Sequence, residues 1–206
     1  MSRTTLGLTL LFLPILAAAT AAPVPNHLRR KEPTLYFPTR VGAKWVYQGD
    51  DKREWTLSVT AVEDTDAGKL VSVTRHLPNG ETSFEKKMLV TPTRLTQIEG
   101  YDGKLKSPWC WLKLPFTKGN SWESDCSSEH FEQKWKCSIV GTEEVEVAAG
   151  KFTAIGVRTT LVSRPLNGGI HFGPSSSVKW YAPGVGVVKD DGGKNRSSWE
   201  LKSFTP

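Results

Sequence analysis

Long hydrophobic runs are almost absent from this 206-residue chain. The one such run, Leu6–Ala19, is shorter than the ~20 residues that a membrane-spanning helix needs, and it contains Pro14. It follows Arg3 and leads into Ala19-Thr-Ala21, the order of segments in a secretory signal peptide. We therefore expect residues 1–21 to be a signal peptide cleaved near Ala21, a secreted or periplasmic location, and no transmembrane segment in the mature chain.

Motifs that carry catalysis or bind metals are also lacking. The chain has no G-x-S-x-G, H-E-x-x-H, C-x-x-C or G-x-x-x-x-G-K-[ST] pattern, and its four histidines are scattered. Adjacent carboxylates such as Glu143 and Glu144 would point to opposite faces of a strand, which does not suit general acid–base catalysis. The sequence therefore predicts no catalytic residue, no cofactor and no metal site.

Charge of one sign is not concentrated in any large part of the chain. The net charge is +6, and the only tight basic cluster, Arg29-Arg30-Lys31, lies in a proline-rich stretch. This composition predicts a solvated linker over residues 22–35. A basic face with interleaved aromatic residues is not apparent, so nucleic acid is not an expected partner.

Only three cysteines are present, and an exported chain can oxidise them. The spacing of Cys126 and Cys137 suits two strands of a hairpin, and we predict a disulfide between them. Cys110 lies between Trp109 and Trp111 and is expected to be a buried thiol. Pairing of Cys110 with Cys126 is an open alternative.

An internal repeat is the most informative feature that the sequence does contain. The frame P-x-x-x-G-x-x-W occurs twice, at Pro38, Gly42 and Trp45 and again at Pro115, Gly119 and Trp122. Further matches follow in the same order: Trp55, Gly68-Lys69 and Asn79-Gly80 correspond to Trp135, Gly150-Lys151 and Asn167-Gly168. We predict two β repeats, residues 36–107 and 108–206, that form one compact structural unit.

Each repeat has the pattern of antiparallel β structure. Trp55, Leu57 and Val59 alternate with polar residues, which is the period-two pattern of a strand with one wet face. Glycine- and proline-rich turn signals separate such runs, and no long segment of the mature chain has helical periodicity. The predicted fold class is all-β: about eleven antiparallel strands joined by hairpins, with the two tandem repeats forming a curved sheet, a half-barrel or a sandwich.

The chain has eight tryptophans. Most of them occupy inward positions of the predicted strands, which favours a role in core packing. The alternative, in which the tryptophans line a ligand groove, stays open at this point. Trp45 and Trp122, each close after a motif glycine, are expected to close the mouth of their sheets.

Three motifs support a family resemblance. They are G-x-x-W-x-Y at residues 42–47, V-x-V-x-A-G-x-F at 145–152, and W-Y-A-P-G-V-G-x-V-K at 180–189, the last of which contains Trp180, Tyr181, Pro183, Gly184 and Gly186. In this order they resemble a family of small exported bacterial β proteins of unassigned function. The resemblance implies an antiparallel β fold and an envelope or extracellular setting, and it transfers no catalytic residues.

The C-terminal motif also has a physical interpretation. Pro183-Gly184 is typical of a type II turn between two strands, with Trp180 and Val187 expected to pack on one side.

Three function hypotheses follow. We favour an exported, non-catalytic β protein that binds an apolar ligand or an envelope partner. The alternatives are a hydrolase or carbohydrate-active enzyme whose site forms only in three dimensions, and a structural or scaffold protein. Convergent carboxylates roughly 5 to 10 Å apart in a cleft would favour the enzyme, whereas an apolar concavity would favour the binding protein.

Overall fold

The computed structural model describes residues 33–129, 131–165, 175–195 and 197–206. The predicted signal peptide, residues 1–21, lies outside the described residues, and so does most of the predicted linker 22–35. The predicted turn at Asn167-Gly168 is also outside them. The described part of the chain contains no helix that could span a membrane.

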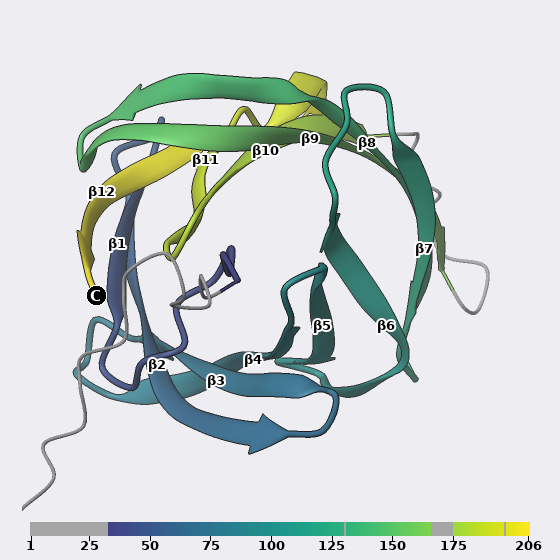
Figure 1. The fold of residues 1–206 in the computed structure, drawn as a ribbon. Coiled ribbons are helices and arrows are strands. Elements are labelled where there is room, and N and C mark those ends of the chain that lie inside the picture. The colour runs from purple at the N-terminus through teal and green to yellow at the C-terminus, as the bar shows by residue number, and fades with distance from the viewer. Residues whose placement is uncertain (1–32, 130, 166–174, 196) are drawn as a thin grey trace, which may run out of the picture. The chain divides into compact units, whose positions relative to one another are not determined.

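Twelve antiparallel strands form a closed barrel in which each strand pairs with its neighbours in the chain and β12 pairs with β1 (Figure 1). The strands are β1 (Lys44–Gly49), β2 (Glu54–Thr65), β3 (Gly68–His76), β4 (Thr82–Val90), β5 (Arg94–Gly100), β6 (Gly103–Lys113), β7 (Ser121–Ser127), β8 (Phe131–Val147), β9 (Gly150–Pro165), β10 (Ser175–Ala182), β11 (Gly186–Asp190) and β12 (Trp199–Thr205). A short 3₁₀ helix, η2 (Gly193–Asn195), precedes β12.

The all-β, hairpin-connected fold class is confirmed, but the sheet is closed rather than being a curved sheet, a half-barrel or a sandwich. Closure depends on the pairing of the first strand with the last, from Lys44 opposite Thr205 to Gly49 opposite Trp199. Local alternation of residues reports which face of a strand is buried and not which distant strand it pairs with.

The two halves of the barrel contain matching turns. Gly42 and Gly119 have φ angles of +91° and +89°, which favour glycine. Their N–H groups donate to the carbonyl oxygens of Val59 and Ile139, at 2.9 and 3.0 Å. The predicted boundary at residues 107/108 falls inside β6, and both halves belong to one compact unit, residues 33–206. The duplication itself stays a prediction, which these matched turns support.

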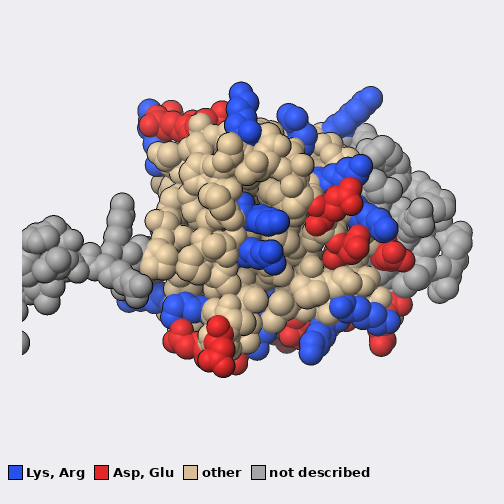
Figure 2. Space-filling model, turned by 45° about the vertical axis from the view of Figure 1, so that its right-hand side comes forward, with Lys and Arg blue, Asp and Glu red and all other residues tan. Residues whose placement is uncertain are grey.

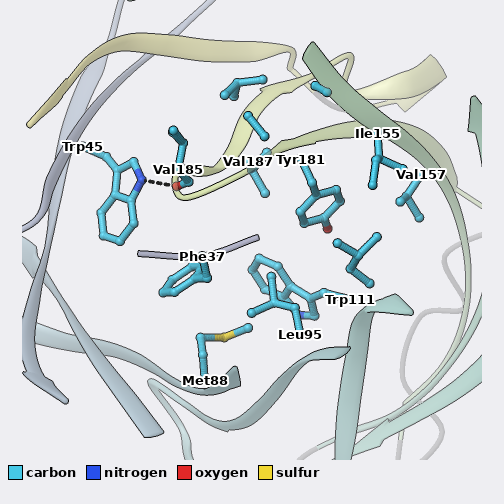
Figure 3. Packing of buried hydrophobic residues seen from close by; sticks show 14 of the residues in the cluster. Phe37, Trp45, Met88, Leu95, Trp111, Ile155, Val157, Tyr181, Val185 and Val187 are labelled. Carbon is cyan, nitrogen blue, oxygen red and sulfur yellow. Dashed lines mark hydrogen bonds between the residues drawn. The ribbon is translucent and has the colours of Figure 1, made fainter. Parts of the chain in front are cut away.

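The barrel interior is packed with apolar side chains that point toward its centre (Figure 3). The segment before β1 enters the ring (Figure 1, purple), and Phe37 lies against Trp45 with ring centroids 5.4 Å apart. The N–H of Gly184 donates to the carbonyl oxygen of Leu35 at 2.8 Å, which ties this segment to the turn between β10 and β11. The entering segment therefore contributes to the core.

The outer surface carries charges of both signs. On the face shown in Figure 2, basic side chains lie among acidic ones and around a broad uncharged area. Elsewhere among the described residues, charged side chains pair across strands, as in Lys202 with Glu54 at 2.6 Å and Lys87 with Glu63 at 3.1 Å. The basic charge is thus dispersed over this face, as its distribution in the sequence predicted.

The predicted disulfide between Cys126 and Cys137 is not formed, and Cys110 is also a free thiol. In the β7–β8 hairpin, Cys126 is opposite Gln133 and Cys137 is opposite Trp122. The two cysteines are therefore offset by four residues, about 13 Å along the strands. Disulfides need Cα atoms within about 7 Å of each other. The sequence spacing suited a hairpin, but the register of the hairpin excludes the bond.

Candidate functional site

The predicted motif residues of the first repeat have structural roles. Pro38 is buried in the segment that enters the barrel. Trp45 is 2% exposed, and its indole N–H donates to the carbonyl oxygen of Val185 at 2.7 Å (Figure 3). This bond joins strand β1 to the turn that precedes β11. Trp45 therefore packs in the core and does not line a groove.

The matching residues of the second repeat lie where the two halves meet. Pro115 is exposed, in the connection between β6 and β7. Trp122 is half-buried, and its indole N–H donates to the carbonyl oxygen of Cys110 at 3.1 Å. The N–H of Cys110 donates in turn to the hydroxyl of Ser124 at 2.9 Å. Trp122 therefore helps to join β6 to β7, a pair of strands with little other backbone pairing.

The C-terminal motif forms the turn between β10 and β11. Gly184 has a φ of +70° in the exposed Pro183-Gly184 corner. Gly186, at φ +91°, lies so close to the ring of Phe37 that a Cβ there would be 3.2 Å from its Cδ2 atom. The motif thus brings the turn against the entering segment.

The expectation that Trp180 packs beside Val187 is wrong. A register shift after Trp180 places Tyr181 opposite Val187, and Tyr181 is 1% exposed in the core. Trp180 instead lies under the ammonium group of Lys189, 5.6 Å from the ring centroid, and its indole N–H is bonded to Glu143. Along β10, Trp180 alternates with the buried Lys179 and Tyr181, so its side chain takes the other face of the strand.

Three other tryptophans form a cluster inside the barrel. Trp109 stacks on Trp135 with ring centroids 4.4 Å apart, and Trp111 is 5.1 Å from Trp109. The indole N–H groups of all three are buried and have no hydrogen-bond acceptor among the described residues. We refer to Trp109, Trp111 and Trp135 as the indole cluster. A buried donor without a partner costs about 1–3 kcal/mol, so three of them in one place call for an explanation.

Two lysines from opposite halves of the chain face the indole cluster. Lys86 Nζ is 4.5 Å from the ring centroid of Trp111, and Lys179 Nζ is 5.2 Å from the same ring. Lys86 is opposite the fully buried Val73. The bulge at Glu85 allows Glu85 and its neighbour Lys86 to lie on the same side of the sheet. The interior is therefore cationic as well as aromatic at this place.

Lys179 and Arg75, the two cations whose charges act on Lys86, both have acidic partners. Arg75 makes two hydrogen bonds to Glu85, at 2.8 and 3.1 Å. Lys179 Nζ is 3.7 Å from a carboxylate oxygen of Asp190, which is 2% exposed. Lys86 has no hydrogen bond or ion pair to any of the described residues, and its contact is the ring of Trp111.

The charge state of Lys86 reflects these surroundings. Burial lowers the pKa of its ammonium group to about 8, and the charges of Lys179 and Arg75 act in the same direction, while Glu85 opposes them. Burial also raises the pKa of the Tyr181 hydroxyl well above its ordinary value. Glu85 therefore acts on Lys86 through its charge, without a hydrogen bond or a close ion pair between the two side chains.

A pocket of about 250 Å³ is lined by Trp55 and Trp199, by Arg75, and by further polar and charged residues: Asp51, Arg53, Glu54, Ser197 and Ser198. Trp55 and Trp199 both contact Tyr47, with ring centroids 5.7 and 4.8 Å from it. Arg75 connects the pocket to the indole cluster, because its partner Glu85 is the neighbour of Lys86.

Sequence reasoning missed the lysines of this site. The tryptophans were expected either to pack or to line a groove; Trp45 packs in the core, and the indole cluster has buried N–H groups without acceptors among the described residues. For Lys179 there was a signal, since it alternates with Ser177 and Tyr181 at an inward position of a strand. The same signal was present for Lys86, which is in step with the buried Met88 and Val90 of its strand.

Comparisons with known proteins define the fold. No family model matches the chain, so the family resemblance stays a prediction. No curated protein matches it either.

Two solved structures share the architecture. One is a candidate lipoprotein from Parabacteroides distasonis ATCC 8503, with a TM-score of 0.58 and 14% identity over 85% of this chain and 100% of the other. The second is a candidate exported protein with a YmcC-like fold from Bacteroides fragilis NCTC 9343, with a TM-score of 0.56 and 13% identity over 84% of this chain and 100% of the other. At these identities the likeness shows a common fold.

Proposed function

We propose that this chain is an exported, non-catalytic barrel protein that binds a small, largely apolar molecule at the aromatic part of its interior. The observation that carries the proposal is the indole cluster, in which three buried N–H groups lack acceptors. A bound molecule would supply both aromatic contact and hydrogen-bond acceptors. The pocket of about 250 Å³, which Arg75 links to Glu85 and so to the neighbour of Lys86, would hold part of such a molecule.

Export is supported by the signal-peptide pattern of residues 1–21 and by the description of both structural relatives as candidate exported proteins or lipoproteins. A non-catalytic role is supported by the pairing of the interior carboxylates. Glu85 is held by Arg75, and Asp190 faces Lys179. Carboxylates that neutralise fixed cations are not poised as an acid–base pair.

The proposal is tested by native mass spectrometry of the mature protein, purified without detergent from its own secretory compartment. The expected result is an additional mass that is lost on denaturation, together with an N-terminus near Ala22. Loading the emptied protein with 1-octanol or octanoate should change the tryptophan fluorescence, because the indole cluster would contact the ligand. A spectrum without a bound molecule, combined with no fluorescence response to either probe, would contradict the proposal and favour an envelope partner protein.

A further inference from the structure

We infer that the junction between β6 and β7 opens as a lateral gate, through which a ligand reaches the indole cluster. This inference rests on the proposed binding function and adds the route of entry. It follows from three features of the described residues: the burial of the indole donors, the sparse pairing of the two strands, and the place of the indole cluster on both sides of the junction.

The donors of the indole cluster are closed off from the surface. Trp111 and Trp135 are 8% and 6% exposed, and the nitrogen atoms of all three indoles are buried. A molecule that accepts from these N–H groups therefore reaches them only after the barrel has opened. Local opening costs least where the fewest hydrogen bonds must break, so the place to look is the most weakly paired pair of strands.

The strands β6 and β7 form such a pair. Among the described residues, their regular pairing is limited to Ser107 opposite Ser127. On its other side, β7 is opposite β8 along its whole length, from Ser121 to Ser127. The pairing of β6 with β7 ends directly before Pro108, which has no N–H to donate, and proline within a sheet is typical of edge strands and bulges. The side of β6 that faces β7 thus resembles an edge.

Two side chains of β7 hold this junction closed. The hydroxyl of Ser124 accepts from the N–H of Cys110 at 2.9 Å, and the indole N–H of Trp122 donates to the carbonyl oxygen of Cys110 at 3.1 Å. Both groups of Cys110 are main-chain groups, which in a regular sheet would bond to the backbone of the neighbouring strand. Two side-chain bonds therefore stand where a continuous ladder would otherwise join the strands.

The two sides of the junction are fixed to different halves of the barrel. β6 is paired with β5, with register positions from Gly103 to Lys113, and β7 is paired with β8. The opposite junction between the halves, β1 with β12, is paired from Lys44 to Gly49. Separation of β6 from β7 therefore leaves these ladders intact, and the β1–β12 junction keeps the halves together.

Opening of the β6–β7 junction divides the indole cluster. Trp109 and Trp111 lie on β6, whereas Trp135 lies on β8, opposite Ser124. The stack of Trp109 on Trp135, with ring centroids 4.4 Å apart, therefore crosses the junction. Separation of β6 from β7 breaks this stack and presents the indole N–H groups to an entering molecule.

Amide hydrogen exchange of the mature, ligand-free protein, resolved by residue with NMR, tests the opening. The N–H of Cys110 should exchange roughly 100-fold faster than the N–H of Val59, which donates to the carbonyl oxygen of Ala43 at 2.9 Å. Trp122→Phe removes the second bond of the junction and keeps the acceptor of the Cys110 N–H. It should therefore speed the exchange of Cys110 by a further factor of roughly 2 to 10.

Trp180→Phe is the matched control, because Trp180 is also half-buried and its indole N–H is bonded to Glu143, outside the junction. It should leave the exchange of Cys110 unchanged. Exchange of Cys110 as slow as that of Val59, or an equal response of Cys110 to the two variants, would overturn the inference that the junction opens locally.

Stopped-flow fluorescence with 1-octanol tests whether the junction is the route of entry. Trp122→Phe should raise the association and dissociation rates by the same factor and leave Kd unchanged, because a gate alters the barrier and not the bound state. Trp180→Phe should keep both wild-type rates. Unchanged rates in Trp122→Phe would overturn the route and leave the proposed binding function standing. Absence of any response to 1-octanol would contradict the binding function, and the exchange of Cys110 would still decide whether the junction opens.

Discussion

Replacing Lys86 by methionine should stabilise the ligand-free protein at pH 7. The ordinary pKa of a lysine is 10.5, and burial lowers that of Lys86 to about 8. Between these two values the unfolded chain binds more protons than the folded one, so charged Lys86 costs folding free energy below pH 8. This cost should disappear as the pH rises to 10.5. Methionine removes the charge and keeps an unbranched chain of similar length.

The size of the effect follows from two opposing contributions. One pKa unit corresponds to about 1.4 kcal/mol, so the cost of the charge is at most about 3 kcal/mol. The Lys86 side chain is only partly buried, and we expect about 2 kcal/mol after screening by water. Loss of the cation–π contact with Trp111 offsets about 0.5–1 kcal/mol of this gain in the free energy of unfolding. The net gain should be about 1 kcal/mol, or about 2–4 °C in Tm for a chain of this size.

Urea denaturation followed by circular dichroism, at pH 7 and at pH 10.5, measures this gain. The advantage of Lys86→Met should be present at pH 7 and absent at pH 10.5. Lys189→Met is the control, because Lys189 also lies over a tryptophan ring, 5.6 Å from the centroid of Trp180. It should change the free energy of unfolding by less than about 0.5 kcal/mol. If Lys86→Met is less stable than the wild type at pH 7, or if its advantage is the same at both pH values, the reasoning about the unpartnered charge is refuted.

Three further predictions concern the barrel itself. Trp45→Phe should lose about 1–3 kcal/mol in urea denaturation, because the buried carbonyl of Val185 loses its donor, and a loss below 0.5 kcal/mol would contradict this. Gly193→Ala should lower the free energy of unfolding by about 2–3 kcal/mol, because its Cβ would lie 1.7 Å from a backbone oxygen. Gly80→Ala, in open space at φ +84°, should lower it by about 1 kcal/mol. Equal losses in the two variants would be inconsistent with the structure. Burial raises the pKa of Cys137 to about 12, so this thiol should resist alkylation in the native protein at pH 7 and all three thiols should react after denaturation. Only one reactive thiol after denaturation would reveal a disulfide.

Much of the local structure follows from the sequence. The alternation from Trp55 to Val59 predicts the buried face of β2, where Leu57 and Val59 are 5% and 1% exposed. The two glycines of the repeat motif, Gly42 and Gly119, predict tight turns, and both have positive φ. These features depend on a few neighbouring residues, and such residues determine backbone conformation directly.

Features that depend on register do not follow from the sequence. Barrel closure requires β1 to pair with β12, which are far apart in the chain. The hairpin register separates Cys126 from Cys137 although their spacing suited a bond. A bulge in the β3–β4 pair turns Glu85 and Lys86 to the same side, against the alternation that sequence reasoning uses. Lys86 and Lys179 are both in step with buried residues of their strands, but lysines are mostly exposed in proteins, so sequence reasoning did not consider them as site residues.

A high-resolution crystal structure of the mature protein, as purified from its own compartment, tests the central claim most directly. We predict non-protein electron density at the indole cluster, with acceptor atoms about 2.7–3.2 Å from at least two of the three indole nitrogens. Side chains of the protein itself that accept from these nitrogens, or a site without density for any bound molecule, would contradict the account.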